Sequence, residues 1–149
     1  MNNAHSVIVP NVQRGKRVGM QGSVLVLKML VVDDNPISQK LTEGMLRHLG
    51  FDVDVVPSGA HALEAIQRQN YELVFMDCQM PLLDGFETTK KLRSLGDGVL
   101  RDLPIIAMTA NGSDDDLERC RRAGMSDCLS KPINFVVLGE KIKACLAKV

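Results

Sequence analysis

Polar side chains that can bind a metal ion or handle a phosphoryl group stand at the ends of apolar runs in this sequence. The set is two carboxylates after the first run, one after the third, a hydroxyl after the fourth and an amine after the fifth: Asp33, Asp34, Asp77, Thr109 and Lys131. Asp77 is the clearest case, because burying an acid at the end of an apolar strand costs desolvation without any structural gain.

Carboxylates that crowd together cannot all stay ionised without a counter-charge. Mg²⁺ (or Mn²⁺) supplies that charge and takes oxygen ligands, here two carboxylates plus a backbone carbonyl. A carboxylate can also attack phosphorus to form an aspartyl phosphate. Lys131 would neutralise charge on the transferred group, and Thr109 would donate a hydrogen bond to it. These residues predict that Asp77 is a phosphoryl acceptor.

Each of these residues also has a purely structural interpretation. Asp33 and Asp34 can begin a helix, where acids are favoured, and a threonine at a strand end is common. Lys131 can be a solvated turn residue. The agreement of four strand ends on one chemistry favours the functional interpretation. Asp84 and Gly85 are interpreted as a turn and a helix start, not as catalytic residues.

The elements that would position these residues alternate along the chain. Strands are predicted from apolar runs at 24–32, 52–56, 72–76, 104–108 and 127–131. Helices are predicted to begin near Asn35, Ser58, Asp84, Ser113 and Asn134. This alternation is typical of a parallel sheet with helices on both faces, an α/β fold. In such a sheet, sites form beyond the carboxyl ends of the strands.

Apolar residues at helical spacing predict which side of each helix packs on the sheet. In the first helix these residues are Ile37, Leu41, Met45 and Leu49, and Gly50 ends the helix. In the next two they are Ala62, Leu63 and Ile66, then Phe86, Leu92 and Leu95. In the last helix they are Leu138, Ile142, Cys145 and Leu146.

Composition bounds the class of protein. The chain has 149 residues, 45% hydrophobic and 24% charged, which fits one globular domain. Residues 1–23 contain no acid and show no clear period, so we interpret them as a linker or flexible arm that precedes a domain at 24–149. A net charge of zero argues against non-specific binding to nucleic acid or to an anionic membrane.

The cysteines and the apolar stretches exclude further classes. Four cysteines without CxxC spacing predict buried, reduced thiols and neither a zinc site nor a disulfide framework. The longest apolar stretch, 24–32, is interrupted by Lys28 and is too short to span a bilayer. No leader peptide is evident, so a cytoplasmic location is expected.

The segments "VVDDN", "MDCQMPLLDG", "MTAN" and "LSKPI", in this order and spacing, resemble the receiver domain of two-component response regulators and hybrid histidine kinases. The resemblance runs from about residue 27 to residue 149. It implies a flavodoxin-like (βα)5 fold with strand order 2-1-3-4-5. It also implies Mg²⁺-dependent transfer of a phosphoryl group from phosphohistidine to one aspartate, so that the domain assists its own phosphorylation.

The resemblance also implies a role for each site residue. Asp77 would be phosphorylated, Asp34 would bind the metal directly, and Asp33 would act largely through metal-bound water. The backbone carbonyl of Gln79 would be a further metal ligand. Thr109 would be the switch hydroxyl and Lys131 the ion-pair partner of the phosphoryl group. The side chains of Gln79 and Asn111 would tune the lifetime of the phosphorylated state.

Cys128 departs from the family pattern. Receivers usually carry Tyr or Phe three residues before the lysine, and rotation of that ring is coupled to the threonine. A thiol cannot fill the pocket that Thr109 would vacate. We therefore expect a muted or different change on the surface formed by the fourth helix, fifth strand and fifth helix.

The motifs look more like receivers fused to, or serving, hybrid kinases than like gene regulators, so the chain is compatible with a fragment of such a kinase. The implied partners are a histidine kinase and a histidine phosphotransfer domain, which would dock beside Ile37, Leu41 and Met45. For Leu41 and Met45, packing on the sheet is the favoured interpretation. No nucleic-acid or direct membrane contact is expected, and the domain is expected to be a monomer or weak dimer.

Three other functions remain open. A flavodoxin-like cofactor carrier would need a phosphate loop after the first strand, and "DDNPIS" is too acidic for that. A phosphohydrolase that works through an aspartyl phosphate would need a second acid where Gln79 stands. A phosphorylation-independent pseudo-receiver, an interaction module only, is opposed by the complete acidic set but kept open by Cys128.

Overall fold

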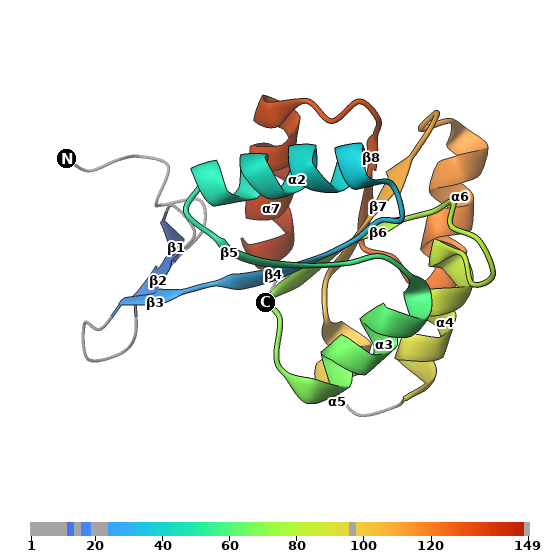
Figure 1. Cartoon of the computed structure of the whole chain (residues 1–149), viewed down its shortest axis with the longest axis horizontal. Helices are drawn as coiled ribbons and strands as arrows, with labels where there is room; N and C mark the ends of the chain where they lie inside the picture. Colours follow the sequence, from blue (N-terminus) through green and yellow to red (C-terminus); the bar gives the residue numbers. More distant parts are fainter. Residues whose placement is uncertain (1–11, 14–15, 19–23, 96–97, 148–149) are drawn as a thin grey trace.

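The structure is a computed structural model that describes residues 12–13, 16–18, 24–95 and 98–147. A five-stranded sheet has the strand order β5-β4-β6-β7-β8, and every neighbouring pair is parallel (Figure 1). Its strands are β4 (Lys28–Val32), β5 (Asp52–Val56), β6 (Leu73–Asp77), β7 (Ile105–Thr109) and β8 (Asp127–Ser130). Numbered by themselves along the chain, these strands have the order 2-1-3-4-5, which confirms the predicted flavodoxin-like sheet.

Helices cover both faces of this sheet (Figure 1). They are α2 (Pro36–His48), α3 (Gly59–Arg68), α4 (Gly85–Ser94), α5 (Gly98–Asp102), α6 (Asp114–Ala123) and α7 (Phe135–Ala147). Side chains of α2 and α7 pack on one face, and side chains of α3, α4 and α6 pack on the other. Within the described ranges, no helix is both long and apolar enough to cross a membrane.

The strands read as continuous apolar runs because both of their faces are covered. In β6, Leu73 and Phe75 contact the core under α2 and α7, whereas Val74 and Met76 contact the core on the opposite face. All four side chains are fully buried. Polar side chains find room only where a strand leaves the sheet, so the strand ends carry the candidate site.

Some predicted boundaries were wrong by a residue. Asp77 and Thr109 are the last residues of β6 and β7, whereas the sequence placed them just after those strands. Lys131 follows β8 and is not part of it. The helix α5 was not predicted, because five residues are too few to show a helical period.

The prediction of one strand over 24–32 was also wrong. Residues in this range form β3 (Val24–Val26) and β4, and β3 pairs antiparallel with β2 (Lys16–Val18), which pairs with β1 (Val12–Gln13). The neighbouring strand β5 explains the break: its first residue, Asp52, donates its N–H to the carbonyl of Leu27 at 3.0 Å, so the parallel ladder has no partner for earlier residues.

The small sheet β1-β2-β3 lies at the amino end of β4 (Figure 1). Strands within 1–23 were not expected, because strands of two and three residues leave no period in a sequence. The rest of that segment lies outside the described residues. The division of the chain into 1–23 and 24–149 stays a prediction.

The buried side of α2 differs from the predicted one. Thr42 and Leu46 are buried, while Ile37 and Leu41 are 73% and 58% exposed. Met45 is partly buried against the core, as predicted, but the prediction that Leu41 packs on the sheet was wrong. Leu41 lies about 100° around the helix from Thr42, which takes it off the core side.

The other helices pack largely as predicted. The expected side chains that are buried or packed against the core are Ala62, Leu63 and Ile66 in α3, Phe86 and Leu92 in α4, and Leu138, Ile142, Cys145 and Leu146 in α7. Leu95 is an exception: it caps the end of α4 and is 45% exposed. Asp84 accepts a hydrogen bond from the Glu87 N–H as the N-cap of α4, which confirms the predicted helix start.

Candidate functional site

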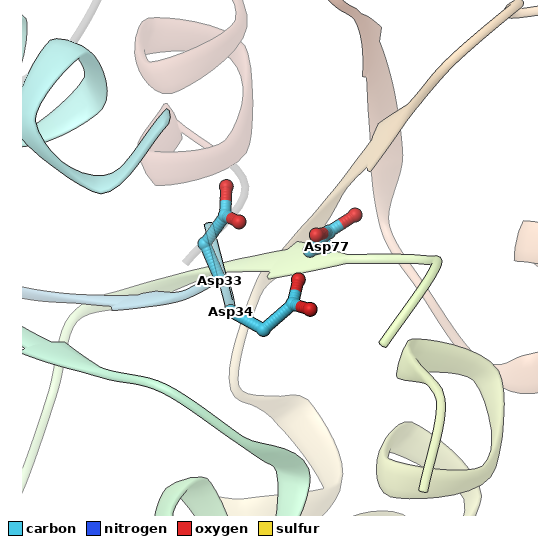
Figure 2. A group of neighbouring side chains, drawn as sticks. All are labelled: Asp33, Asp34 and Asp77. Atoms are coloured by element: carbon cyan, nitrogen blue, oxygen red, sulfur yellow. The ribbon is translucent and has the colours of Figure 1, made fainter. Parts of the chain in front are cut away.

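Three carboxylates meet at the carboxyl ends of β4 and β6 (Figure 2). One oxygen each of Asp33, Asp34 and Asp77 lies within 4.8 Å of the others. Asp33 and Asp77 are buried, whereas Asp34 is exposed. This is an all-oxygen donor set with excess negative charge, which suits a hard divalent cation such as Mg²⁺.

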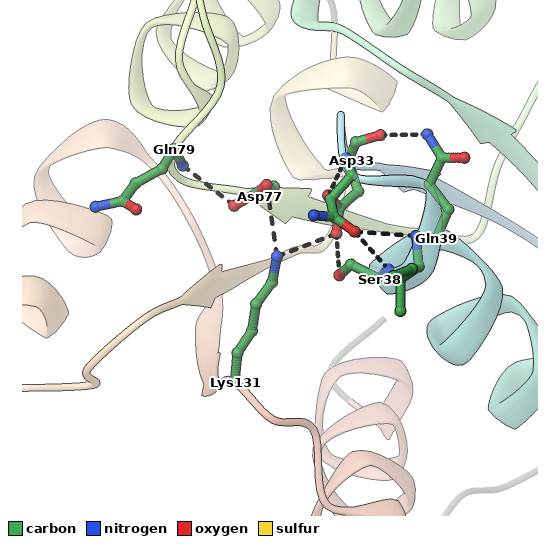
Figure 3. Close-up of polar contacts among 8 residues, drawn as sticks. Asp33, Ser38, Gln39, Asp77, Gln79 and Lys131 are labelled. Carbon is green, nitrogen blue, oxygen red and sulfur yellow. Dashed lines mark hydrogen bonds and ion pairs between the residues drawn. The ribbon is translucent and has the colours of Figure 1, made fainter.

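The Asp33 side chain is held by the first turn of α2 and by Lys131 (Figure 3). Its Oδ1 accepts the Asn35 N–H at 3.0 Å, and its Oδ2 accepts both the Ser38 hydroxyl at 2.5 Å and the Lys131 ammonium at 3.1 Å. The amide of Gln39 donates to the Asp33 backbone carbonyl at 2.6 Å. Neither Ser38 nor Gln39 was predicted from the sequence as a site residue, although polar residues in a first helical turn commonly bond to nearby groups.

Asp77 is buried, and its neighbours shift its pKa in opposite directions. Its Oδ1 accepts the Gln79 N–H at 3.1 Å, and its Oδ2 lies 3.5 Å from the Lys131 ammonium. Burial raises the pKa of Asp77 to about 6; the charge on Asp33 also raises it, while the Gln79 N–H and Lys131 lower it. At neutral pH the carboxylate is therefore largely ionised, at an energetic cost that a bound cation would relieve.

Lys131 links the site across the sheet (Figure 3). Its ammonium contacts Asp33 at 3.1 Å and Asp77 at 3.5 Å, and its backbone N–H donates to the Thr109 carbonyl at 2.7 Å. The side chain is 28% exposed, so it has access to solvent and to a ligand. The ammonium is therefore shared by two buried acids and leaves them with a net negative charge.

Thr109 ends β7, the strand next to β6, and is buried. Among the buried side-chain oxygens and nitrogens of the described chain, its Oγ1 is the atom without a hydrogen-bond partner. A buried hydroxyl left unpaired costs about 1–3 kcal/mol, so it is a group for which a function should be sought. A hydrogen bond to an incoming oxygen would satisfy it.

Two predicted tuning residues lie at the margin of the site. The Gln79 side chain is exposed and points away from Asp77, while its backbone N–H holds that carboxylate (Figure 3). Asn111 is exposed in the loop after β7. Their roles in setting the lifetime of a phosphorylated state stay predictions.

Cys128 lies in a cluster of thiols next to the site. Its side chain contacts that of Cys120 on α6, which in turn contacts Cys78, the residue after Asp77. Burial raises the pKa of each of the three thiols above its usual value. All four cysteines of the chain are buried, as predicted, and none forms a disulfide in the structure.

Replacing Cys128 by Tyr tests the prediction that the missing aromatic residue mutes the response to phosphorylation. The replacement is also expected to destabilise the fold. The ring would enter a packed cluster of buried residues, so we expect a loss of about 1–3 kcal/mol in the free energy of unfolding. If an aromatic residue is what the switch lacks, phosphorylation of this variant should change amide exchange in α6, β8 and α7 more than in the parent. Equal responses of variant and parent would contradict the prediction.

Comparisons with known proteins give consistent matches. A family model described as the response regulator receiver domain matches residues 29–143. Probable histidine kinase 1 of Oryza sativa subsp. indica is 35% identical over 148 residues, which covers 80% of this chain and 15% of that protein. The chain thus spans a small part of this kinase.

Solved structures of receiver domains are also similar to this chain. The receiver domain of sensor histidine kinase PA1611 from Pseudomonas aeruginosa PAO1, with a magnesium ion coordinated in its active site cleft, is 39% identical, with a TM-score of 0.74 over 80% of this chain and 97% of that one. A chain of the Saccharomyces cerevisiae co-crystal structure of the phosphotransfer protein Ypd1 and the Ssk1 receiver domain is 28% identical, with a TM-score of 0.71 over 78% and 86%.

Proposed function

The chain belongs to the response regulator receiver family, and from this premise we propose that Asp77 accepts a phosphoryl group from a phosphohistidine in a Mg²⁺-dependent reaction. The observation that carries the proposal is the site at the strand ends: three convergent carboxylates, one of them the buried Asp77, with Lys131 between two of them. A purely structural acid would not require this arrangement.

The proposed chemistry is a displacement at phosphorus. A carboxylate oxygen of Asp77 forms the new P–O bond as the P–N bond breaks, and the imidazole of the donor histidine leaves. Lys131, already 3.5 Å from Asp77, then faces the charge on the phosphoryl oxygens. The unpaired Thr109 hydroxyl donates a hydrogen bond to one of these oxygens.

The metal ion would be held by the carboxylates of Asp33, Asp34 and Asp77 and by the backbone carbonyl of Gln79. The three carboxylates fit this task, because their oxygens converge and their charges need compensation. When bound, Mg²⁺ supplies charge neutralisation at the phosphoryl oxygens. The magnesium ion in the active site cleft of the PA1611 receiver domain supports Mg²⁺ as the metal here.

The proposed partner docks beside α2. Ile37 and Leu41 are large apolar side chains left exposed on the helix that begins right after Asp33 and Asp34. Such a surface suits a helical partner that brings a histidine to Asp77. The Ypd1–Ssk1 complex supports a histidine phosphotransfer protein in this role, and the kinase matches support a histidine kinase as a further partner. Both would meet this domain in the cytoplasm.

The alternative functions gain no support from the site. A flavin phosphate would meet three carboxylates at the end of β4 and β6, which repel it. A phosphohydrolase needs an acid two residues after the nucleophile, and Gln79 there has no acidic proton and points away from Asp77 (Figure 3).

Intact mass spectrometry tests the proposal. The chain is incubated with acetyl phosphate, a small phosphodonor, in Mg²⁺ and in excess EDTA. We expect a gain of one phosphoryl mass in Mg²⁺, none in EDTA, and loss of the gained mass with hydroxylamine, which cleaves acyl phosphates. A chain that gains no mass in Mg²⁺, or gains it equally in EDTA, would refute the proposal and favour the pseudo-receiver.

A further inference from the structure

The hydroxyl of Ser38 is a side-chain contact to the Asp33 carboxylate that no predicted role explains. We propose that Ser38 is a positioning residue: it orients Asp33 for the metal ion and remains the partner of Asp33 when Lys131 turns to the phosphoryl group. This inference rests on the proposed function, because it concerns the same metal and phosphoryl group.

The contacts of Asp33 carry the inference. Asp33 has no exposed surface, so its two oxygens depend on protein partners or on a bound ion. Asn35 supplies a backbone N–H to Oδ1, while Ser38 and Lys131 share Oδ2 at 2.5 and 3.1 Å (Figure 3). Two side chains therefore donate to Oδ2: Lys131, which is charged, and Ser38, which is neutral.

Ser38 is not needed to begin α2. The helix is capped by Asn35, whose side-chain oxygen accepts the N–H groups of Ile37 and Ser38 at 2.9 and 3.0 Å. Pro36 occupies the first turn, where its missing N–H costs nothing. The Ser38 hydroxyl is therefore free to point back at Asp33, and removing it should leave the helix start intact.

The position of Lys131 explains why a second donor is useful. Its ammonium is shared between Asp33 and Asp77, at 3.1 and 3.5 Å. A phosphoryl group on Asp77 brings more negative charge than the carboxylate it replaces, and so draws the ammonium away from Asp33. Oδ2 would then be a buried, charged acceptor whose remaining side-chain donor is Ser38.

The same contacts would orient Asp33 toward a bound metal ion before transfer. With the hydroxyl present, Asp33 keeps its orientation whether or not Lys131 contacts it. Without the hydroxyl, Oδ2 depends on the ammonium, which competes with a cation for the carboxylate. Hydrogen-bond partners of metal ligands commonly contribute about 10–100-fold in metal affinity, and we expect the low end of that range for Ser38.

Mg²⁺ titration of unphosphorylated protein tests this inference without any turnover. The midpoint of thermal unfolding is followed against Mg²⁺ concentration for the wild type, Ser38→Ala and Ser38→Thr, and the apparent dissociation constant is taken from the curves. We expect Ser38→Ala to raise this constant about 10-fold. Ser38→Thr keeps the hydroxyl and should stay near the wild type.

Ser126→Ala is the matched control. Its hydroxyl accepts the Ile105 N–H at 3.1 Å, at the opposite end of β7 from Thr109. This variant also loses one serine hydroxyl hydrogen bond, but with a backbone N–H as the donor and far from the acidic site, so it should keep the wild-type Mg²⁺ affinity. Unchanged affinity in Ser38→Ala, or an equal loss in Ser126→Ala, would overturn the inference. A wild type that does not respond to Mg²⁺ would instead overturn the proposed function.

Discussion

Replacing Asp77 by Asn is expected to abolish phosphoryl incorporation and, without divalent metal at neutral pH, to stabilise the fold by about 3 kcal/mol. The amide has the shape of the carboxylate but is no nucleophile. It also carries no charge, so it avoids both burial of an anion and repulsion by Asp33. A variant that loses function while it gains stability cannot owe the loss to misfolding.

The stability difference should depend on pH in a defined direction. The pKa of Asp77 is raised from its ordinary value of 3.8 to about 6, so the folded chain holds this proton more tightly than the unfolded chain. The resulting stabilisation is present below about pH 4 and is lost as pH rises to about 6. The advantage of Asp77→Asn should therefore be small at pH 4 and complete above pH 6.

Urea unfolding in EDTA at several pH values between 4 and 8 measures this difference, and intact mass measures the phosphoryl gain. Added Mg²⁺ should reduce the stability difference between the variant and the wild type at pH 7, because the cation compensates the negative charge of Asp77 in the wild type. Asp115→Asn, an exposed acid in the first turn of α6, is the control and should keep the mass gain. If the difference in unfolding free energy between Asp77→Asn and the wild type did not change with pH, the raised pKa of Asp77 would not be its cause.

The strand ends of this site were predictable because burial constrains them strongly. A strand covered on both faces tolerates few polar residues, so Asp77 after an apolar run already marks the point where the chain leaves the sheet. Parallel strands bring their carboxyl ends to one edge, which places Asp33, Asp77 and Thr109 together without knowledge of any contact.

The contacts that hold the site were not predictable, because they depend on side-chain direction. Ser38 and Gln39 are ordinary residues of a first helical turn, and no spacing shows that they bend back to Asp33. Arg93 likewise reads as a basic residue in the last turn of α4. In the fold it is half-buried and donates to the carbonyls of Leu100, Leu103 and Gly124, contacts between segments far apart in the sequence.

Apolar periodicity also leaves the buried side of a helix uncertain. Leu41 follows Ile37 at helical spacing, yet Thr42 takes the inward position because α2 is rotated to pack Leu46 on the sheet. The exposed pair Ile37 and Leu41 then becomes a candidate contact surface. Here the failure of a packing prediction points to function.

Gly85 connects α4 to the end of β6 by direct backbone contact. It is the first residue of α4, and its N–H donates to the Cys78 carbonyl at 3.2 Å. A Cβ added at Gly85 would overlap the carbonyl oxygen of Asp77 and lie 3.0 Å from its carbonyl carbon and from Cys78 Cα. These are backbone atoms at the end of a buried strand, so they cannot rotate away as a side chain would.

Gly85→Ala is therefore expected to destabilise the fold by about 3 kcal/mol and to slow phosphoryl incorporation, because Asp77 must move when α4 is displaced. Gly44→Ala is the matched control: it lies within α2 with no neighbour in reach of a new Cβ, and the same change there should stabilise by about 0.5–1 kcal/mol. Urea unfolding and the time course of mass gain from acetyl phosphate measure both effects. If the two variants had equal stability and equal rates, the backbone of Asp77 would be more compliant than its burial and strand position imply.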